Sequence, residues 1–101
     1  MAAPVTFQIG QTVGIPCQIQ GGAFASEYLV SIVTEDGILS GFADQADVRP
    51  NSSDPSRGRI RATVVAVALD SIKVRIYGSF FTTAAGMMQV SSGWAQEHLL
   101  A

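Results

Sequence analysis

Residues 59–78 read RIRATVVAVALDSIKVRIYG, and this stretch decides the fold. Hydrophobic side chains recur at every second position, which is typical of a half-buried strand and not of a helix. Residues 69–71 interrupt the pattern, so residues 59–68 and 72–78 are predicted to form a β-hairpin. Alternate residues of a strand share a face, and we expect one face to pack inward. That face carries Ile60, Ala62, Val64, Ala66, Ile72, Val74 and Ile76.

The same alternation extends outward in both directions along the chain. Residues 11–20 predict a long strand whose buried face includes Cys17, and residues 28–34 and 38–43 predict a second hairpin around an Asp-Gly turn. Residues 44–47 predict a short helical turn that Asp44 caps, after which Val48 returns to the core. Residues 49–59 predict a loop, residues 87–91 a last strand, and residues 94–100 a short helix that starts after Gly93.

These elements predict a single all-β domain over residues 1–101, a small barrel of five or six strands with short helical turns. The order of elements in residues 10–50 resembles that of SH3-like barrels, in which a one-turn helix follows the penultimate strand. The chain departs from that pattern because two further strong strands follow.

Two segments of the chain are similar to each other, namely Ser40-Gly41-Phe42-Ala43 and Ser92-Gly93-Trp94-Ala95. Each is expected to follow a strand and to precede a helical turn. If they record a duplication, the half-units are 1–50 and 57–101 and the barrel is pseudo-twofold. The alternative is that both segments solve one packing problem, in which a small Ser-Gly step lets an aromatic ring cap the barrel.

The composition excludes several classes of protein. The chain is 48% hydrophobic with a net charge of −2, which excludes intrinsic disorder, and its one cysteine excludes a disulfide scaffold and a cysteine-based zinc site. No apolar run is long enough to span a membrane. The first residues do not resemble a signal peptide, and with one cysteine this predicts a cytoplasmic protein. In profile the chain also resembles the small proteins encoded by mobile gene cassettes, which implies no activity.

The sequence offers no set of catalytic residues. It lacks a phosphate-binding glycine loop and a nucleophile elbow, and its single histidine, His98, is expected to serve at a helix end. Asp44 and Asp47 are expected to cap and solvate one turn instead of binding metal. We therefore predict a non-enzymatic protein without cofactor or metal.

The charges are segregated along the chain. All six basic residues lie between Arg49 and Arg75, whereas residues 1–48 contain five acids and no base. The second hairpin face is mixed apolar and basic, with Arg59, Arg61, Val65, Val67, Lys73, Arg75 and Tyr77. An apolar centre with an Arg- and Tyr-rich rim is typical of an interface, so the leading hypothesis is an interaction module that acts as a homo-oligomer through this face, with a further protein partner as a possible addition.

Three other interpretations stay open. The face could bind nucleic acid or another anion through its arginines and tyrosine, or it could be solvated surface that protects a sheet edge. A small ligand could also bind at the barrel mouth, where we expect Phe42, Phe80, Phe81 and Trp94 to meet.

Overall fold

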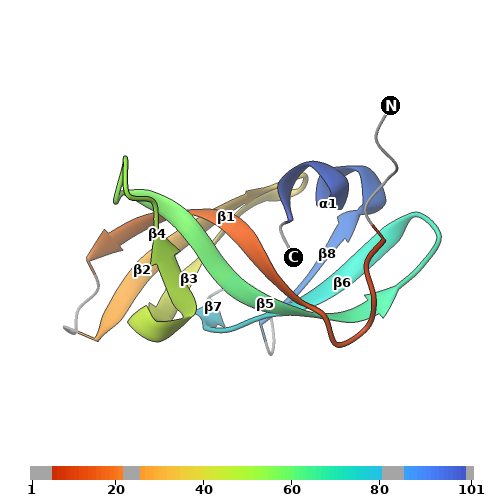
Figure 1. Cartoon of the computed structure of the whole chain (residues 1–101), viewed down its shortest axis with the longest axis horizontal. Coiled ribbons are helices and arrows are strands. Elements are labelled where there is room, and N and C mark those ends of the chain that lie inside the picture. Colours follow the sequence, from red (N-terminus) through yellow and green to blue (C-terminus); the bar gives the residue numbers. More distant parts are fainter. Residues whose placement is uncertain (1–5, 22–25, 81–85, 100–101) are drawn as a thin grey trace.

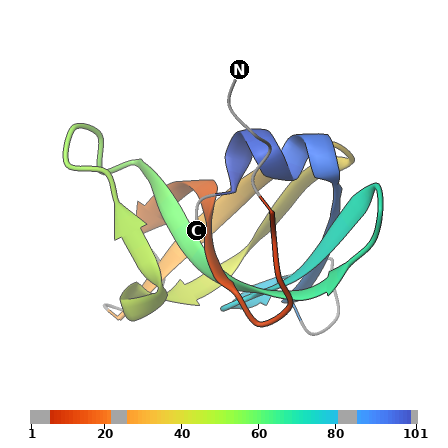
Figure 2. The same ribbon diagram turned by 45° about the vertical axis from the view of Figure 1, so that its right-hand side comes forward.

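A computed structural model of the chain describes residues 6–21, 26–80 and 86–99 (Figure 1). In these ranges, eight strands form one antiparallel sheet that curls into a half-barrel, and a short helix lies against one side of it (Figures 1 and 2). The elements are, in chain order, β1 (Thr12–Gly21), β2 (Glu27–Thr34), β3 (Gly37–Asp44), the 3₁₀ turn η1 (Gln45–Asp47), β4 (Val48–Pro50), β5 (Arg57–Val67), β6 (Ser71–Ile76), β7 (Ser79–Phe80), β8 (Met87–Ser91) and α1 (Ser92–His98).

The strand order across the sheet is β7-β3-β2-β1-β5-β6-β8, and β4 pairs separately with β5. The longest strand, β5, therefore contacts three partners: it pairs with β1, with β4 and with β6. This central position of β5 brings the first half of the chain against the second, so the two expected half-units share one sheet.

The all-β barrel-like architecture is confirmed, and so are both predicted hairpins, β2–β3 and β5–β6. The prediction of five or six strands was too low because two strands are very short. β4 has three residues, of which the last two lie in the segment predicted to be a loop, and β7 has two. Strands this short leave almost no alternation in the sequence, so periodicity could not reveal them.

The core lies on the inner face of the curled sheet, as the alternation predicted. Ile15 and Ile60 are fully buried and face each other directly across β1 and β5. Cys17 and Val48 are also buried, as expected. The other buried residues of the predicted inward hairpin face are Ala62, Val64, Ile72, Val74 and Ile76.

The prediction that Ala66 packs inward was wrong because β5 contains a β-bulge. Val64 pairs with Val74, but the next partner of β6, Lys73, is Ala66, so Val65 is an extra residue on β5. A bulge reverses the alternation beyond it, since two residues on one strand then oppose one on the other. Ala66 is exposed, and Val67, which is 45% exposed, comes into register with the buried Ile72 instead of with Ser71.

The helical segments are capped by side chains that precede them. Asp44 Oδ1 accepts a hydrogen bond from the backbone N–H of Ala46 at 2.9 Å, which confirms the predicted cap of η1. Ser91 Oγ accepts from the backbone N–H of Trp94 at 3.1 Å, so α1 begins at Ser92 and not after Gly93 as predicted. A Ser at the N-cap satisfies an amide that would otherwise lack a partner.

The two similar Ser-Gly-aromatic-Ala segments adopt different conformations. Residues 40–43 lie inside β3, whereas residues 92–95 form the start of α1. The expectation therefore holds in part for each: the first segment precedes a helical turn but lies within a strand, and the second follows a strand but already forms the helix.

Among the residues that the structure describes, none belongs to a helix long and apolar enough to cross a membrane.

Candidate functional site

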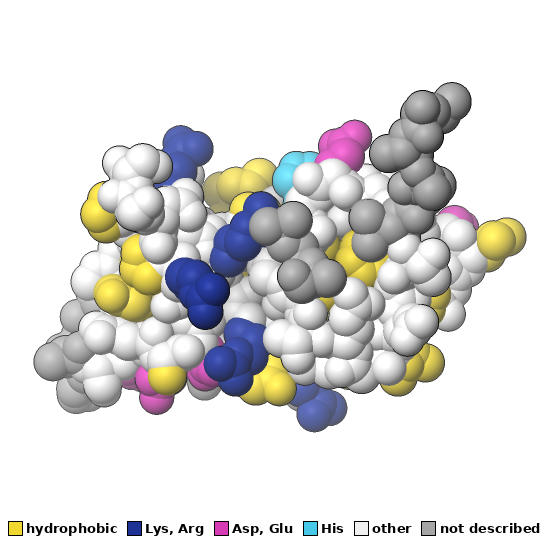
Figure 3. Space-filling view, viewed as in Figure 1, with side chains coloured by type: hydrophobic (Ala, Val, Ile, Leu, Met, Phe, Trp, Pro, Cys, Tyr) yellow, Lys and Arg dark blue, Asp and Glu magenta, His cyan; other side chains and the backbone are white. Residues whose placement is uncertain are grey.

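All six basic residues project from one face of three neighbouring strands. Arg57, Arg59 and Arg61 occupy alternate positions of β5 and so share a face. The register extends this face onto β4 and β6, since Arg49 is opposite Arg59 and Arg75 is opposite Thr63. We call it the basic face and define it as Arg49, Arg57, Arg59, Arg61, Lys73 and Arg75. Several of the dark-blue side chains cross one view of the molecule as a band (Figure 3).

The middle of the basic face is built around Arg61. Its Nη1 lies 3.7 Å from Asp47 Oδ1, and its guanidinium carbon lies 5.5 Å from the centre of the Tyr77 ring. The Tyr77 hydroxyl in turn lies within hydrogen-bond distance, 3.2 Å, of the Thr63 hydroxyl. These contacts bring the predicted residues Arg61 and Tyr77 together and place the guanidinium over the aromatic ring.

Two arginines face each other across the β4–β5 pair. Arg49 and Arg59 are direct partners in the register, on the same face of the sheet. Like charges directly opposite each other destabilise a sheet. The fold relieves this repulsion by drawing one of the two side chains away over β1.

Arg59 is that side chain, and it joins the centre of the sheet to the end of α1. Its Nη1 donates to the carbonyl oxygen of Gly14 at 3.1 Å and to that of His98 at 2.9 Å. A cation near the carbonyls at a helix C-terminus is favourable. Sequence periodicity placed Arg59 on the basic face correctly, but its tie to His98 depends on tertiary structure alone.

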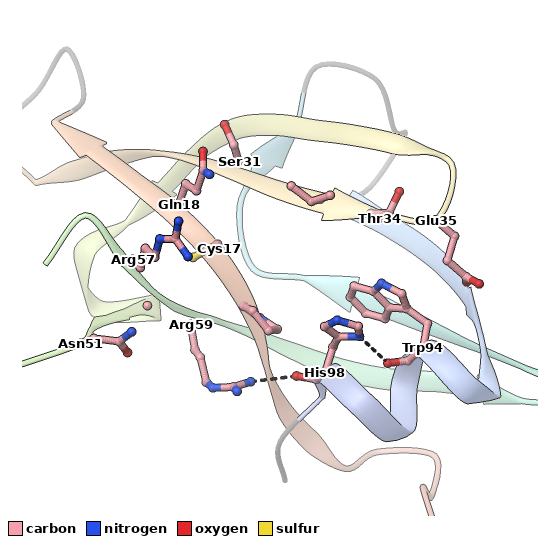
Figure 4. A pocket seen from close by; sticks show the side chains of 13 residues that line it. Cys17, Gln18, Ser31, Thr34, Glu35, Asn51, Arg57, Arg59, Trp94 and His98 are labelled. Atoms are coloured by element: carbon pink, nitrogen blue, oxygen red, sulfur yellow. Dashed lines mark hydrogen bonds between the residues drawn. The ribbon is translucent and has the colours of Figure 1, made fainter. Parts of the chain in front are cut away.

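A groove of about 610 Å³ lies where the basic face meets α1 (Figure 4). Its two walls differ in chemistry. Arg57, Gln18 and Ser31 lie on one side, and Trp94 and His98 of α1 lie on the other. The remaining lining residues are Pro16, Cys17, Val33, Thr34, Glu35, Asn51, Gly58 and Arg59.

The aromatic wall is a stacked pair. The Trp94 and His98 rings are 4.5 Å apart between centroids and inclined by 21°. His98 Nδ1 lies 3.0 Å from the Trp94 carbonyl oxygen, within hydrogen-bond distance, which fixes the imidazole against the helix. The spacing of four residues puts both rings on one side of α1.

The opposite wall carries a cation that is almost unengaged. The Arg57 side chain is 68% exposed, and its Nε lies 3.9 Å from Asp54 Oδ2. An exposed pair at that distance contributes little. Arg57 is therefore available to an anion that enters the groove.

Glu35 closes one end of the groove by fixing the start of α1. Its Oε1 accepts from the backbone N–H of Ser91 at 2.7 Å, and its Oε2 accepts from the Ser91 hydroxyl at 2.8 Å. These hydrogen bonds lower the pKa of Glu35 because they favour the charged carboxylate. The tip of the β2–β3 hairpin is thereby attached to the helix.

Cys17 also lines the groove but is not poised for chemistry. Burial raises the pKa of its thiol to about 11, against a smaller opposite effect of the Arg59 charge. A thiol with so high a pKa is almost wholly protonated at neutral pH and a poor nucleophile. The thiol is free and buried, in agreement with its predicted packing role.

A second groove of about 430 Å³ lies between β1 and the η1–β4 segment. Arg49, Arg59 and Arg61 line it, together with the Asp47 carboxylate that pairs with Arg61. Arg59 lines both grooves, so the two hollows adjoin one another along the basic face.

Two of the four aromatic residues expected at the barrel mouth, Trp94 and Phe42, can be compared with these grooves. Trp94 lines the first groove, whereas Phe42 is opposite Leu29 in the sheet and lines neither of the two. Phe80 pairs with Gly41 through β7, and Phe81 lies outside the described residues. A pocket formed by all four rings therefore stays a prediction.

The β-bulge in β5 changes the composition of the predicted mixed face. Arg61, Lys73, Arg75 and Tyr77 share one side as predicted, but the bulge removes Val67 from their row. Val65 stays, half-buried, as the apolar residue of the original set on this side. Within the described ranges, no three His, Cys, Asp or Glu residues are grouped so that they could hold a metal ion.

Sequence reasoning did not find the groove with Trp94, His98 and Arg57. Its residues come from β1, β2, β5 and α1 and from two connecting segments, and no local pattern links them. The one available signal was the spacing of Trp94 and His98 on a predicted helix.

Comparisons with protein-family models, with curated proteins and with solved structures found no match to this chain.

Proposed function

We propose that this protein is a non-enzymatic binding module for single-stranded nucleic acid and that the basic face is its contact surface. One observation carries the proposal: six cations from β4, β5 and β6 lie on one side of the sheet although the chain as a whole has a net charge of −2. Basic residues gathered on one side create a local positive potential even though the net charge of the chain is negative.

The spacing of the cations supports an extended anionic partner. Alternate residues of a strand are separated by about 6.8 Å, so Arg57, Arg59 and Arg61 form a regular row along β5. Tyr77 and the Trp94–His98 pair lie beside this row and offer rings on which bases could stack. Sequence-tolerant binding of single strands combines such a basic track with aromatic rings.

The bulge in β5 favours this alternative over self-association through the same face. The interface hypothesis required an apolar centre containing Val65 and Val67, and Val67 is in register with the buried Ile72 instead. What remains around Arg61 is mainly polar and basic, which suits phosphate contacts better than a protein interface core.

The test is the binding of a fluorescently labelled short oligothymidylate, followed by anisotropy at salt concentrations from about 50 mM to about 200 mM. We expect micromolar affinity that falls steeply as salt rises. Replacing Arg61 and Arg75 by Gln should weaken binding about tenfold and reduce the salt slope by about 1.4, the equivalent of two phosphate contacts.

The matched control changes the net charge equally at another surface. Ile9→Glu with Leu69→Glu also lowers the net charge by two, and both side chains are exposed. If this control weakens binding as much as the arginine variant, or if the wild type shows no binding at about 50 mM salt, the proposal is wrong.

Self-association is a second candidate function, and a specific observation favours it. Val33 and Ile38 are direct partners at the tip of the β2–β3 hairpin and are 59% and 64% exposed. Two adjoining exposed apolar side chains are the start of an interface for a second copy. A multimer by light scattering that resists high salt and is abolished by Ile38→Glu would support it, and a monomer would refute it.

Three finer proposals rest on the sequence pattern. We propose that residues 10–50 are organised as in SH3-like barrels, that the protein works in the cytoplasm, and that it belongs with the proteins of mobile gene cassettes. The free, buried Cys17 supports a reducing compartment. Detection of the native protein in an oxidising compartment would contradict the second of these.

A further inference from the structure

We propose that the groove between Arg57 and the Trp94–His98 pair is a receptor for one unpaired nucleobase together with its phosphate group. This inference rests on the proposed function and deepens it, since it names the part of the strand that each wall contacts.

The two walls match the two halves of a nucleotide. The stacked rings of Trp94 and His98 present an aromatic surface, and Pro16 and Val33 add apolar contacts to the lining. A planar base gains by stacking on such rings whatever its identity. Arg57 lies across the groove from the rings and can bind a phosphate through its fork of N–H donors (Figure 4).

Polar groups between the walls suit the edge of a base. Gln18 and Asn51 line the groove and carry amides that both donate and accept hydrogen bonds. Ser31 lies beside Gln18 in the sheet register, and its hydroxyl lies 3.1 Å from that of Ser40, within hydrogen-bond distance. Adaptable amides of this kind allow the groove to accept more than one base.

Contacts within the protein hold the groove open before any ligand binds. Arg59 fixes the end of α1 through the His98 carbonyl, and Glu35 fixes its start through Ser91. Because both ends of the helix are tied to the sheet, the aromatic wall keeps its distance from Arg57. Such preorganisation reduces the ordering cost of binding.

A duplex cannot use this receptor because its bases are stacked within the helix. The groove therefore predicts a preference for single strands, which the basic face alone would not provide. The groove also predicts that a strand without bases binds more weakly than a strand of the same length with bases.

Trp94 makes the test direct because it is the single tryptophan of the chain. We would titrate the full-length protein with oligothymidylate and with an abasic strand of the same length, and follow both Trp94 fluorescence and strand anisotropy. Oligothymidylate should bind about 5- to 100-fold more tightly, the contribution of one stacked base, and should change Trp94 fluorescence. The abasic strand should bind without that change.

A pair of arginine variants separates the groove from the rest of the basic face. A stacked base seats its own phosphate at Arg57, and an abasic nucleotide is not held there. Arg57→Gln should therefore weaken oligothymidylate more than the abasic strand, whereas Arg75→Gln should weaken both strands equally. Both side chains are exposed, so both variants should fold.

The outcomes distinguish the two proposals. Equal affinity for the two strands, or base-dependent binding without a change at Trp94, overturns the groove while leaving the basic face in place. If neither strand binds, the proposed function is wrong, and so is the proposal that the groove receives a nucleotide.

Discussion

Glu35 and Ser91 are 56 residues apart in the sequence, yet the Glu35 carboxylate accepts hydrogen bonds from both the backbone N–H and the hydroxyl of Ser91, at 2.7 and 2.8 Å. This contact attaches the β2–β3 hairpin to the start of α1. It gives the helix a fixed position over the groove, although α1 has only seven residues. So short a helix would not be stable by itself in water.

The Glu35–Ser91 contact predicts a pH dependence of stability. The folded pKa of Glu35 is lower than its ordinary value of 4.5, so its stabilising effect is complete above that pH and is lost as the pH falls through the folded pKa. We expect the melting temperature of the wild type to drop more steeply below about pH 4.5 than that of Glu35→Gln. If the melting temperatures of the two proteins fall equally between pH 7 and pH 3, the contact is contradicted.

Arg59 should be more important for stability than its neighbours on the basic face. Arg59→Met keeps the aliphatic stem over Gly14 but removes the hydrogen bonds to the Gly14 and His98 carbonyls. We expect a loss of about 1.5–3 kcal/mol in chemical denaturation, with a shifted Trp94 emission because the end of α1 is released. Arg75→Met, at an exposed site, should stay within about 0.5 kcal/mol of the wild type.

Gly58 is required where β4 crosses close to β5. A methyl group at this position would overlap the carbonyl oxygen of Arg49 and would lie 2.8 Å from the Cα atom of Pro50. Gly58→Ala should therefore cost about 1–3 kcal/mol and displace Arg49 from the basic face. Gly21→Ala is the control, since nothing lies within 4 Å of its added methyl group, and an equal effect of the two would refute the close approach.

Cys17 should resist alkylation in the folded protein. A rise in thiol pKa from 9.0 to about 11 leaves about 100-fold less thiolate at neutral pH, and burial restricts access further. Iodoacetamide should therefore label the native chain far more slowly than the chain unfolded in urea, as followed by mass spectrometry. Equal labelling rates would mean that β1 and β5 open readily around the thiol.

The same thiol also predicts a loss of stability in alkali. The folded pKa is raised, so stability is unaffected below about pH 9 and declines as the pH rises from there toward 11. Cys17→Ala should show less of this decline. Denaturation midpoints at pH 8 and pH 10 for both proteins provide the measurement.

The predictable part of the fold was the part governed by alternation. Residues 60–64 and 72–76 alternate strictly, and the inward set assigned to them is buried except beyond the bulge. The bulge at Val65 could not be predicted because valines and alanines continue the apolar pattern on both sides of it. The apolar pattern is compatible with Ala66 opposite either Ile72 or Lys73, and packing in the core selects Lys73.

The candidate site was predictable only as a surface. Residue types and alternation were enough to place Arg61, Lys73, Arg75 and Tyr77 on one side of the sheet. They did not bring Trp94 near Arg57, because the two are on different elements 37 residues apart and meet only when α1 folds back onto the sheet.

By itself, the sequence determined the class of fold, the two hairpins, the buried set and the concentration of positive charge, since these follow from the period of two and from the positions of the six basic residues. Tertiary structure alone decided that β5 contains a bulge, that Arg59 joins the sheet to α1, and that Arg57 faces two stacked rings across a groove. The physical reason is that alternation fixes which side of a strand a residue occupies. The contacts between elements depend on how a twisted sheet curls and on where a short helix finds hydrogen-bond partners.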